Sequence, residues 1–243
     1  MLETFGRAAG FLLLHLGTLA PIILTLTVPV ELVRSYLMLQ TELLRTPGLN
    51  LLIQYGTELP FHALVEPAFF MAVFALPTGR RLTVLDAYGE ALRWWPRMFG
   101  VYVKLWVLTM LGFLLFVIPA IWIMVVFAFA DLAALLDPER QLNPFSTSNR
   151  LVAGFQLRIL GVVLLQLAAS VLFDQILSLN PALLQVWWAR ALAGSAFAVV
   201  VRWFSIVLVI FYVRARLAHG ERVPSFEELF PRLAERYPGV AER

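Results

Sequence analysis

Residues 99–136 read FGVYVKLWVLTMLGFLLFVIPAIWIMVVFAFADLAALL and contain only two charged side chains, Lys104 and Asp131. A helix crosses a bilayer with roughly 20 mainly apolar residues, so this segment is long enough for two crossings. Its single proline, Pro119, lies near the middle, where the missing backbone donor interrupts a helix. We therefore predict a transmembrane hairpin that turns at Ile118-Pro119-Ala120.

Four more segments have the same apolar character, two before this hairpin and two after it. The sequence therefore predicts an all-α fold, a polytopic transmembrane helix bundle of about six spans that occupies residues 1–220. A tail with one short amphipathic helix follows at residues 221–243. The spans are expected at residues 11–33, 59–76, 99–117, 120–136, 155–177 and 193–213.

The composition excludes an ordinary soluble domain. Hydrophobic residues make up 60% of the 243 residues and charged residues only 14%, whereas soluble domains have about 45–50% and about 25%. There is no cysteine, which excludes disulfides, thiolate metal ligands and cysteine nucleophiles. The net charge of +3 is small and the basic residues are spread along the loops, so we expect no nucleic-acid partner. The partners we expect are membrane lipids and other membrane proteins.

The basic residues predict the orientation of the bundle, because cytoplasmic loops of membrane proteins are enriched in lysine and arginine. One basic residue precedes the first span, four lie in the second loop, three lie in or beside the fourth loop, and six lie in the tail. The opposite face has only Arg34, Arg45 and Arg190. We therefore expect a multi-pass membrane protein with both termini in the cytoplasm.

Short amphipathic helices are predicted beside the spans. Thr83 and Asp86 have the spacing of a helix-capping box, and apolar residues recur at helical spacing from there to Trp95, as in a helix that lies in the membrane interface. We interpret such helices as filling joints between spans, with binding of a lipid or a partner protein as the alternative. The others are expected at Asn143-Pro144, at Asn180-Pro181 and from Ser225 to Glu228.

Charged side chains at membrane depth need a partner, water or a function, because each costs roughly 2.5–3.5 kcal/mol on insertion scales. Lys104 lies fourteen residues before Ile118, and Asp131 lies thirteen residues after it. On two antiparallel helices these positions have the same depth, near the cytoplasmic third of the membrane. We therefore predict a structural ion pair between Lys104 and Asp131.

A second set of charges, Glu66, Asp174 and Arg202, is expected in the outer third of the membrane. Counted from the outer face, Arg202 lies about nine residues into its span, Glu66 about seven and Asp174 about four. The three form a candidate intramembrane polar cluster. Two interpretations are open: a proton- or substrate-linked site that faces an outer cavity, or an interhelical clamp with Asp174 solvated at the interface.

No pattern typical of an enzyme or a cofactor site is present. The three histidines, His15, His62 and His219, do not have the i, i+4 spacing of a metal-binding helix. Ser195 follows Gly194 but lacks both the glycine-flanked elbow and the base of a serine hydrolase. We therefore predict no catalytic residue, no metal and no cofactor.

The middle of the chain resembles a family of six-span bacterial membrane proteins. The similarity is best over residues 80–170 and rests on an interfacial helix before a span, the segment Leu115 to Ala120, a second span, and a further span after Asn149-Arg150-Leu151. The family includes YciC-like proteins and the membrane domain attached to some glycerophosphodiester phosphodiesterases. Two positions depart from its pattern: Ala120 stands where the family has the glycine of Ile-Pro-Gly, and Leu151 stands where serine often follows the arginine.

The resemblance implies a six-span helical fold without an assigned activity, and we do not transfer phosphodiesterase chemistry to this chain. The resemblance also implies the bacterial inner membrane, and we expect a non-enzymatic integral protein of that membrane that interacts with lipids or partner membrane proteins. The alternative is a small transporter or substrate-binding membrane subunit that uses Glu66, Asp174 and Arg202; an intramembrane hydrolase built on Ser195 is a third. A polar cavity that reaches Glu66 and Arg202 would favour transport, whereas direct pairing without a cavity would favour the structural interpretation.

Overall fold

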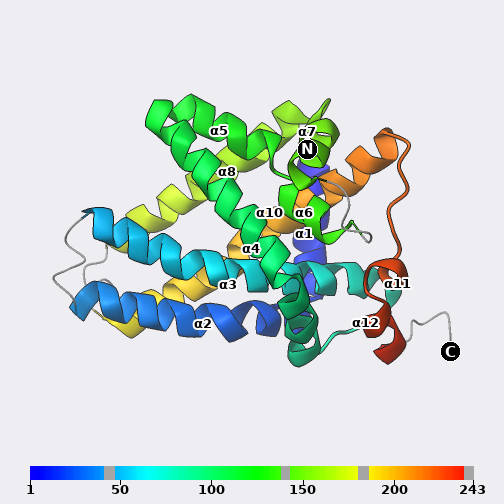
Figure 1. Ribbon diagram of the computed structural model, residues 1–243. Coiled ribbons are helices and arrows are strands. Elements are labelled where there is room, and N and C mark those ends of the chain that lie inside the picture. The colour runs from blue at the N-terminus through cyan, green and yellow to red at the C-terminus, as the bar shows by residue number, and fades with distance from the viewer. Residues whose placement is uncertain (41–46, 138–142, 180–185, 238–243) are drawn as a thin grey trace.

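The computed structural model describes residues 1–40, 47–137, 143–179 and 186–237, with the side chains of residues 38–58 left out. Every regular element in these ranges is a helix (Figure 1). Six helical segments are long and apolar enough to cross a membrane, which confirms the predicted all-α bundle. The chain is a multi-pass membrane protein. Its crossings are α2 (Leu16–Gln40), α3 (Pro47–Ala75), α4 (Val84–Leu115), α5 with α6 (Val117–Val126 and Ala130–Leu135), α8 (Gln156–Ser178) and α10 (Trp187–Ala218).

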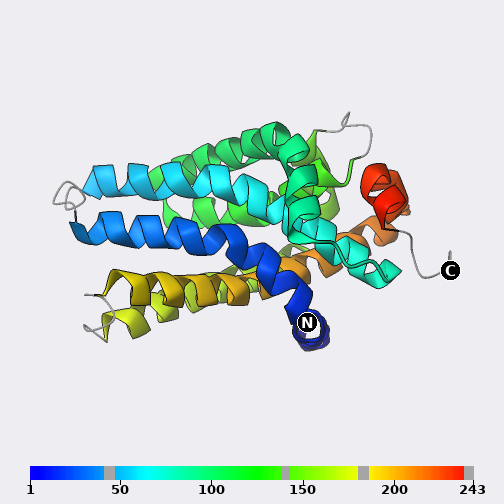
Figure 2. The ribbon, with the colours of Figure 1, turned by 90° about the horizontal axis from the view of Figure 1, so that it is seen from below.

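The six crossings are arranged as a ring. α10 packs against α2, α2 against α3, α3 against α4 and α4 against α5; α5 then contacts α8, which returns to α10. α2, α3 and α10 run side by side, whereas the α4–α5 hairpin leans away from them (Figures 1 and 2). The first crossing therefore lies next to the last, although almost the whole chain separates them.

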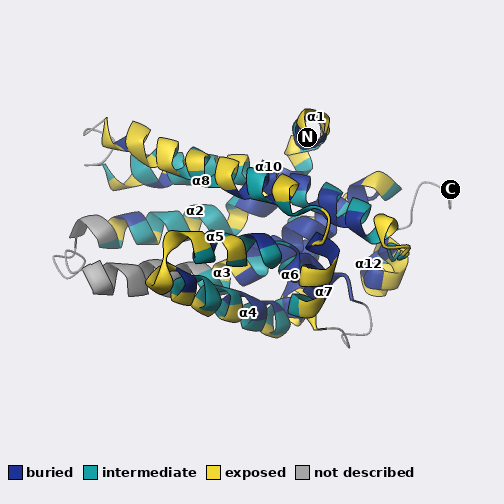
Figure 3. Ribbon diagram, turned by 90° about the horizontal axis from the view of Figure 1, so that it is seen from above, coloured by how far each residue is buried: buried dark blue, intermediate teal, exposed yellow. Residues whose placement is uncertain are grey.

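Buried residues gather in the half of the bundle that carries α6, α7 (Pro144–Val152) and α12 (Pro231–Arg236) (Figure 3). Its core includes Met98, Phe129, Phe211 and Tyr212, which are all fully buried. α3 is the most enclosed crossing in its described part: 67% of its most apolar stretch is buried, compared with 17% of the corresponding stretches of α2 and α8. Elsewhere the crossings expose large apolar side chains, a surface that is stable in lipid and aggregates in water.

The first crossing begins later than predicted. A separate helix, α1 (Leu2–Leu14), ends at His15, where the backbone leaves the helical conformation (φ −109°, ψ 13°), and α2 starts one residue later. Residues 11–14 of the predicted span 11–33 therefore belong to α1. α1 runs across the direction of α2 (Figures 1 and 2), as expected of a helix in the membrane interface. The indole N–H of Trp203 on α10 donates a hydrogen bond to the Phe5 carbonyl oxygen (3.1 Å) and holds α1 to the bundle.

The predicted hairpin of the third and fourth crossings is present, but it turns at a different residue. Phe116 is extended (φ −174°, ψ 162°) and separates α4 from α5. Pro119, where we predicted the turn, lies in the first turn of α5. Backbone N–H groups there have no partner within the helix, so proline is tolerated. The two helices approach closely, because a Cβ added at Gly112 would lie 2.8 Å from the Ala120 backbone.

α4 is one continuous helix, whereas the sequence predicted an interfacial helix up to Trp95 and a separate span at 99–117. The cap at its start is as predicted: the Thr83 side chain accepts a hydrogen bond from the Asp86 amide (3.3 Å). Pro96 lies inside the helix, where proline removes one backbone hydrogen bond and bends the helix without ending it. α4 accordingly changes direction along its length (Figure 1).

The break between α5 and α6 is closed by α7, whose predicted start at Asn143-Pro144 is confirmed. Ser148 on α7 donates its hydroxyl proton to the Val126 carbonyl oxygen (2.9 Å) and accepts a hydrogen bond from the Phe129 amide (3.1 Å). These bonds satisfy backbone groups that the break leaves without helical partners. The amphipathic stretch predicted at Asn180-Pro181 lies outside the described residues.

The tail folds back onto the segment between α3 and α4. That segment contains η2 (Leu76–Thr78), which ends at Gly79 in the left-handed conformation (φ 77°) that glycine adopts readily. The next residue, Arg80, is buried; it forms an ion pair with Glu227 and lies over the Phe226 ring. α11 (Phe226–Leu229) begins with the predicted capping box of Ser225 and Glu228.

Candidate functional site

Two charged residues from distant parts of the chain meet inside the bundle. Glu66 is on α3 and Arg202 is on α10, and each residue is only 5% exposed. Arg202 Nη1 donates a hydrogen bond to Glu66 Oε2 within an ion pair, and the Ser205 hydroxyl donates to Glu66 Oε1 (3.2 Å). The guanidinium also lies over the Phe69 ring, 5.7 Å from its centroid. The structure thus brings together two of the three residues of the predicted cluster.

The Glu66–Arg202 pair connects helices that are not neighbours in the ring, since α2 lies between α3 and α10. Separating two ions at membrane depth leaves each charge uncompensated, which is costly. The pair therefore holds α3 and α10 together across the interior, as the clamp interpretation requires.

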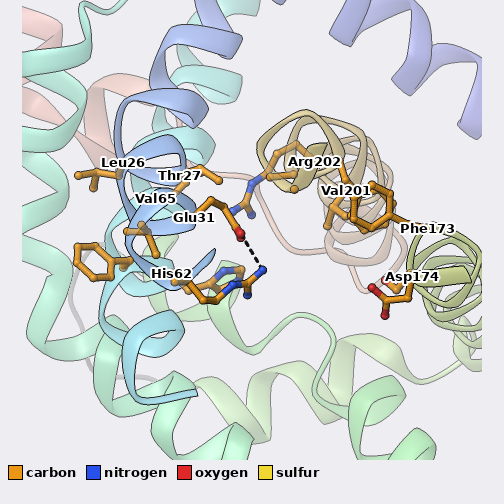
Figure 4. A pocket seen from close by; sticks show the side chains of 16 residues that line it. Leu26, Thr27, Glu31, His62, Val65, Phe173, Asp174, Val201 and Arg202 are labelled. Carbon is orange, nitrogen blue, oxygen red and sulfur yellow. Dashed lines mark hydrogen bonds and ion pairs between the residues drawn. The ribbon is translucent and has the colours of Figure 1, made fainter. Parts of the chain in front are cut away.

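Arg202 also lines a cavity of about 380 Å³ between α2, α3, α8 and α10 (Figure 4). Glu66 itself is not part of the lining. Sequence analysis treated a direct pair and a polar cavity as alternatives, and both are present. The polar lining includes Thr27, Glu31, Arg34, His62, Ser170 and Asp174, and the apolar lining includes Leu26, Val65, Phe173, Phe197 and Val201.

Asp174, the third predicted member of the cluster, does not join the buried pair. It is exposed on α8, and within the described residues it has no hydrogen-bond or ion-pair partner. Figure 4 shows its carboxylate across the cavity from Glu31. The preceding residue, Phe173, stacks on Phe197 of α10 with 4.2 Å between the ring centroids. The predicted cluster is therefore a buried pair and a separate carboxylate on the same cavity.

Sequence reasoning missed Glu31 and Arg34, which also line the cavity. Arg34 Nη2 lies 2.8 Å from Glu31 Oε2, in an ion pair along α2. Gly194 on α10 leaves room for this carboxylate, because a Cβ there would lie 3.0 Å from Glu31 Oε2. The available signal was the pair of opposite charges three residues apart near the end of an apolar helix, a spacing that places them on one face.

His62 lies between the cavity and the buried pair. It lines the cavity, its side chain is 44% exposed, and its Nε2 lies 3.9 Å from Glu66 Oε1. Its ring meets the Tyr102 ring edge-on, with 5.0 Å between centroids. The Tyr102 hydroxyl in turn donates a hydrogen bond to Asp131 Oδ2 (3.4 Å). A row of ionisable side chains thus leads from the cavity into the packed half of the bundle.

The predicted ion pair between Lys104 and Asp131 is not found among the described contacts. Asp131 accepts hydrogen bonds from the Tyr102 hydroxyl and, at 2.7 Å, from the Leu132 amide. Lys104 is exposed and lines a surface hollow beside Asn143. Equal depth in the membrane does not decide which residues face each other. Tyr102 and Lys104 are two residues apart, about 200° around the helix, so they lie on nearly opposite faces.

Ser195 and two of the histidines have partners within their own helices or at a helix end. The Ser195 hydroxyl donates to the Ala191 carbonyl oxygen (2.8 Å), and His219 Nδ1 lies 2.8 Å from the Ala215 carbonyl oxygen. The His15 ring contacts the Phe11 ring in a tilted arrangement, with 4.7 Å between the centroids. In the part of the chain that the structure describes, no group of three or more histidine, aspartate or glutamate side chains is placed to hold a metal ion.

The chain matches no protein-family model, no curated protein and no solved structure. The resemblance to the six-span bacterial family therefore stays a prediction, and the number of crossings is the feature that agrees with it.

Proposed function

We propose that this protein is a non-enzymatic substrate-binding protein of the bacterial inner membrane, a small transporter or the membrane subunit of one. One observation carries the proposal: charged or ionisable side chains from four crossings, Glu31, His62, Asp174 and Arg202, line a single cavity. Ionisable residues inside membranes are costly and mark substrate and ion pathways. The volume of about 380 Å³ falls within the range of roughly 300–1,000 Å³ for small-molecule sites.

A purely structural clamp accounts for only part of this arrangement. Glu66 and Arg202 compensate each other directly and need no cavity. Asp174, in contrast, presents a carboxylate at the cavity without a partner in the described residues. Glu31 and Arg34 form their ion pair at the cavity wall, where the Glu31 carboxylate lies beside Gly194 of α10. These groups support a binding role beyond the clamp.

The distribution of arginines supports an orientation with both termini in the cytoplasm. α1 and α12 lie toward the same end of the bundle (Figure 1). The cavity-lining residues come from the opposite halves of their crossings, near the end of α2 and the start of α10. In this orientation the cavity belongs to the outer half of the membrane, where a solute or an outer-leaflet lipid would enter it.

Interaction with lipids or partner membrane proteins is a second candidate function, favoured by α1. This helix lies across the bundle (Figure 2) and leaves Leu2, Leu13 and Leu14 exposed, with Leu2 at 89%. Apolar side chains on a helix parallel to the membrane plane are suited to insertion among lipid chains. This role is compatible with a ligand in the cavity.

The proposal is tested by filling the cavity. Ala198 lines it and Ala196, on the same helix, is exposed outside the lining, so Ala198→Trp blocks the space and Ala196→Trp is the matched control. Each protein is purified in lipid nanodiscs, and its bound small molecules and lipids are identified by native mass spectrometry, with Glu66→Gln as a third variant. We expect a species that wild type and Ala196→Trp retain and Ala198→Trp loses. The absence of any such species contradicts the proposal.

A further inference from the structure

Resting on the proposed function, we infer that the cavity binds a small zwitterion. An ammonium group of the ligand pairs with Asp174, and a phosphate or carboxylate group accepts hydrogen bonds from Arg202. The two protein groups belong to different crossings, α8 and α10, and line the same cavity. The inference follows from two features of the cavity: a carboxylate without a partner in the described residues, and a guanidinium whose hydrogen-bond donors are only partly used.

The need for a cation comes from the acidic side chains. Glu31 is paired with Arg34, and Glu66 is paired with Arg202. Asp174 is the cavity-lining carboxylate for which the described residues provide no partner. A carboxylate at this depth is stabilised by a positive charge. An ammonium group, with three hydrogen-bond donors in a small volume, suits a carboxylate on the wall of a cavity.

The place for an anion is set by the hydrogen-bond donors of Arg202, which the ion pair with Glu66 does not use up. Its guanidinium has five N–H donors, but within the described part of the chain only Nη1 donates to a protein group, and Nε is buried without a partner. Glu66 meets only part of this demand, because its other oxygen accepts from Ser205. A phosphate or carboxylate in the cavity would accept from the guanidinium donors that face it, as planar guanidinium groups donate well to such anions.

The size and the walls of the cavity limit the ligand. A volume of about 380 Å³ lies at the low end of the range of roughly 300–1,000 Å³ for ligand pockets, so it suits a compact molecule or a headgroup rather than a whole lipid. The stacked rings of Phe173 and Phe197 and the side chains of Leu26 and Val65 provide apolar contact for the atoms between the two charges. Both a free zwitterion and the headgroup of an aminophospholipid have this chemistry.

The test uses the full chain in phosphatidylcholine nanodiscs, titrated calorimetrically with phosphoethanolamine. Ethanolamine provides the ammonium group alone, and methyl phosphate the anion alone. We expect phosphoethanolamine to bind about tenfold more tightly than either, the effect of one additional charge-assisted hydrogen bond. Asp174→Asn should remove this advantage over methyl phosphate. Gln175→Asn, at the next residue, which is exposed and outside the lining, should leave it unchanged.

A second arm distinguishes a lipid from a soluble ligand. Nanodiscs containing phosphatidylethanolamine are examined by native mass spectrometry, and retention of this lipid is compared between wild type, Asp174→Asn and Ala198→Trp. Retention that both variants lose indicates a lipid headgroup, whereas binding confined to phosphoethanolamine indicates a soluble zwitterion; either supports the inference. If Asp174→Asn changes neither the calorimetric affinity nor the lipid retention, the inference of a zwitterion is wrong. Any other species that Ala198→Trp excludes would still support the proposed function. If Ala198→Trp excludes no species, the proposed function fails as well.

Discussion

In the half of the bundle that carries α6, α7 and the tail, buried aromatic and aliphatic side chains fill the space between the crossings (Figure 3). In the other half, α2, α3, α8 and α10 surround a cavity with charges on its walls (Figure 4). The same helices contribute to both halves. One end of each of these four crossings is therefore fixed by close packing, while the other end is held by a few polar contacts.

The packed half has an additional attachment, which we call the tail clasp: the contacts of Arg80 and Asp86 with Glu227, Arg236 and Tyr237. The clasp joins the end of the chain to the start of α4. In the cavity half, the corresponding attachment among the described residues is the buried pair of Glu66 and Arg202. Four sets of variants test how far this division of the molecule holds.

The largest effect is expected for the pair that joins α3 to α10. Glu66→Leu leaves the buried Arg202 charge without its partner, which costs about 3–5 kcal/mol for buried ion pairs. We expect a large fall in the unfolding temperature of the purified protein in detergent. The double variant Glu66→Leu with Arg202→Leu should be more stable than the single variant, because no lone charge remains. An equal fall in the unfolding temperature of the single and the double variant would show that the pair does not hold the cavity half together.

The next largest effect is expected in the hairpin. Gly112→Ala places a Cβ 2.8 Å from the Ala120 backbone, and overpacking of this kind costs about 1–3 kcal/mol. Gly100→Ala on the same helix is the control, since nothing lies within 4 Å of an added Cβ there. That variant should be neutral or slightly stabilising, because alanine favours a helix by roughly 0.8–1.0 kcal/mol over glycine. Thermal unfolding of the two variants side by side measures the difference, and a neutral Gly112→Ala would mean that α4 and α5 can separate.

A smaller and local effect is expected in the tail clasp. Arg80→Met removes the ion pair with Glu227, whose side chain is 46% exposed, so we expect a loss of only about 1 kcal/mol after solvent screening. Arg81→Met is the control, because Arg81 is exposed. The chain has no cysteine, so Leu233→Cys, at a buried position of α12, provides a single thiol. Faster modification of this thiol in Arg80→Met than in Arg81→Met is the expected result, and equal rates would contradict the clasp.

The smallest effect is expected from pH. Backbone hydrogen bonds lower the pKa of Glu227 and of Glu228 below the ordinary 4.5, and Arg80 and Arg222 lower them further. Groups with a lowered folded pKa stabilise the fold above the ordinary value, and the contribution is lost as pH falls through the folded pKa. An environment-sensitive dye on Ala234→Cys should therefore report loosening of the tail below pH 4.5. In a Glu227→Gln and Glu228→Gln background this pH dependence should weaken, and the remainder belongs to Asp86, whose pKa is lowered by hydrogen bonds from Thr83 and Tyr237.

Features that depend on a few neighbouring residues could be predicted from the sequence. The six crossings follow from apolar length, and the starts of α4, α7 and α11 follow from the capping residues Thr83, Asn143 and Ser225. The helix breaks at His15 and Phe116 were not predictable in this way, because neither residue type marks a helix end.

The cavity could be predicted only in part, because its residues meet through the closure of the ring. Depth along the membrane placed Glu66 and Arg202 correctly, since depth follows from counting residues. It failed for Lys104 and Asp131, because rotation about the helix axis decides contact and Tyr102 occupies the facing side of α4. Glu31 was not predicted as part of the site, because its contact with Gly194 depends on the packing of α10 against α2.

The attachment of α1 has a mechanical consequence. α1 is held to α10 by the Trp203 hydrogen bond to Phe5 and by the bond from Arg214 to the Thr4 hydroxyl (3.1 Å). Trp203 directly follows Arg202 in the chain, so the anchor of α1 and the charge that pairs with Glu66 belong to the same turn of α10. Helices at the interface respond to the thickness and curvature of the bilayer. A displacement of α1 by the surrounding lipid would therefore act on the turn of α10 that carries Arg202.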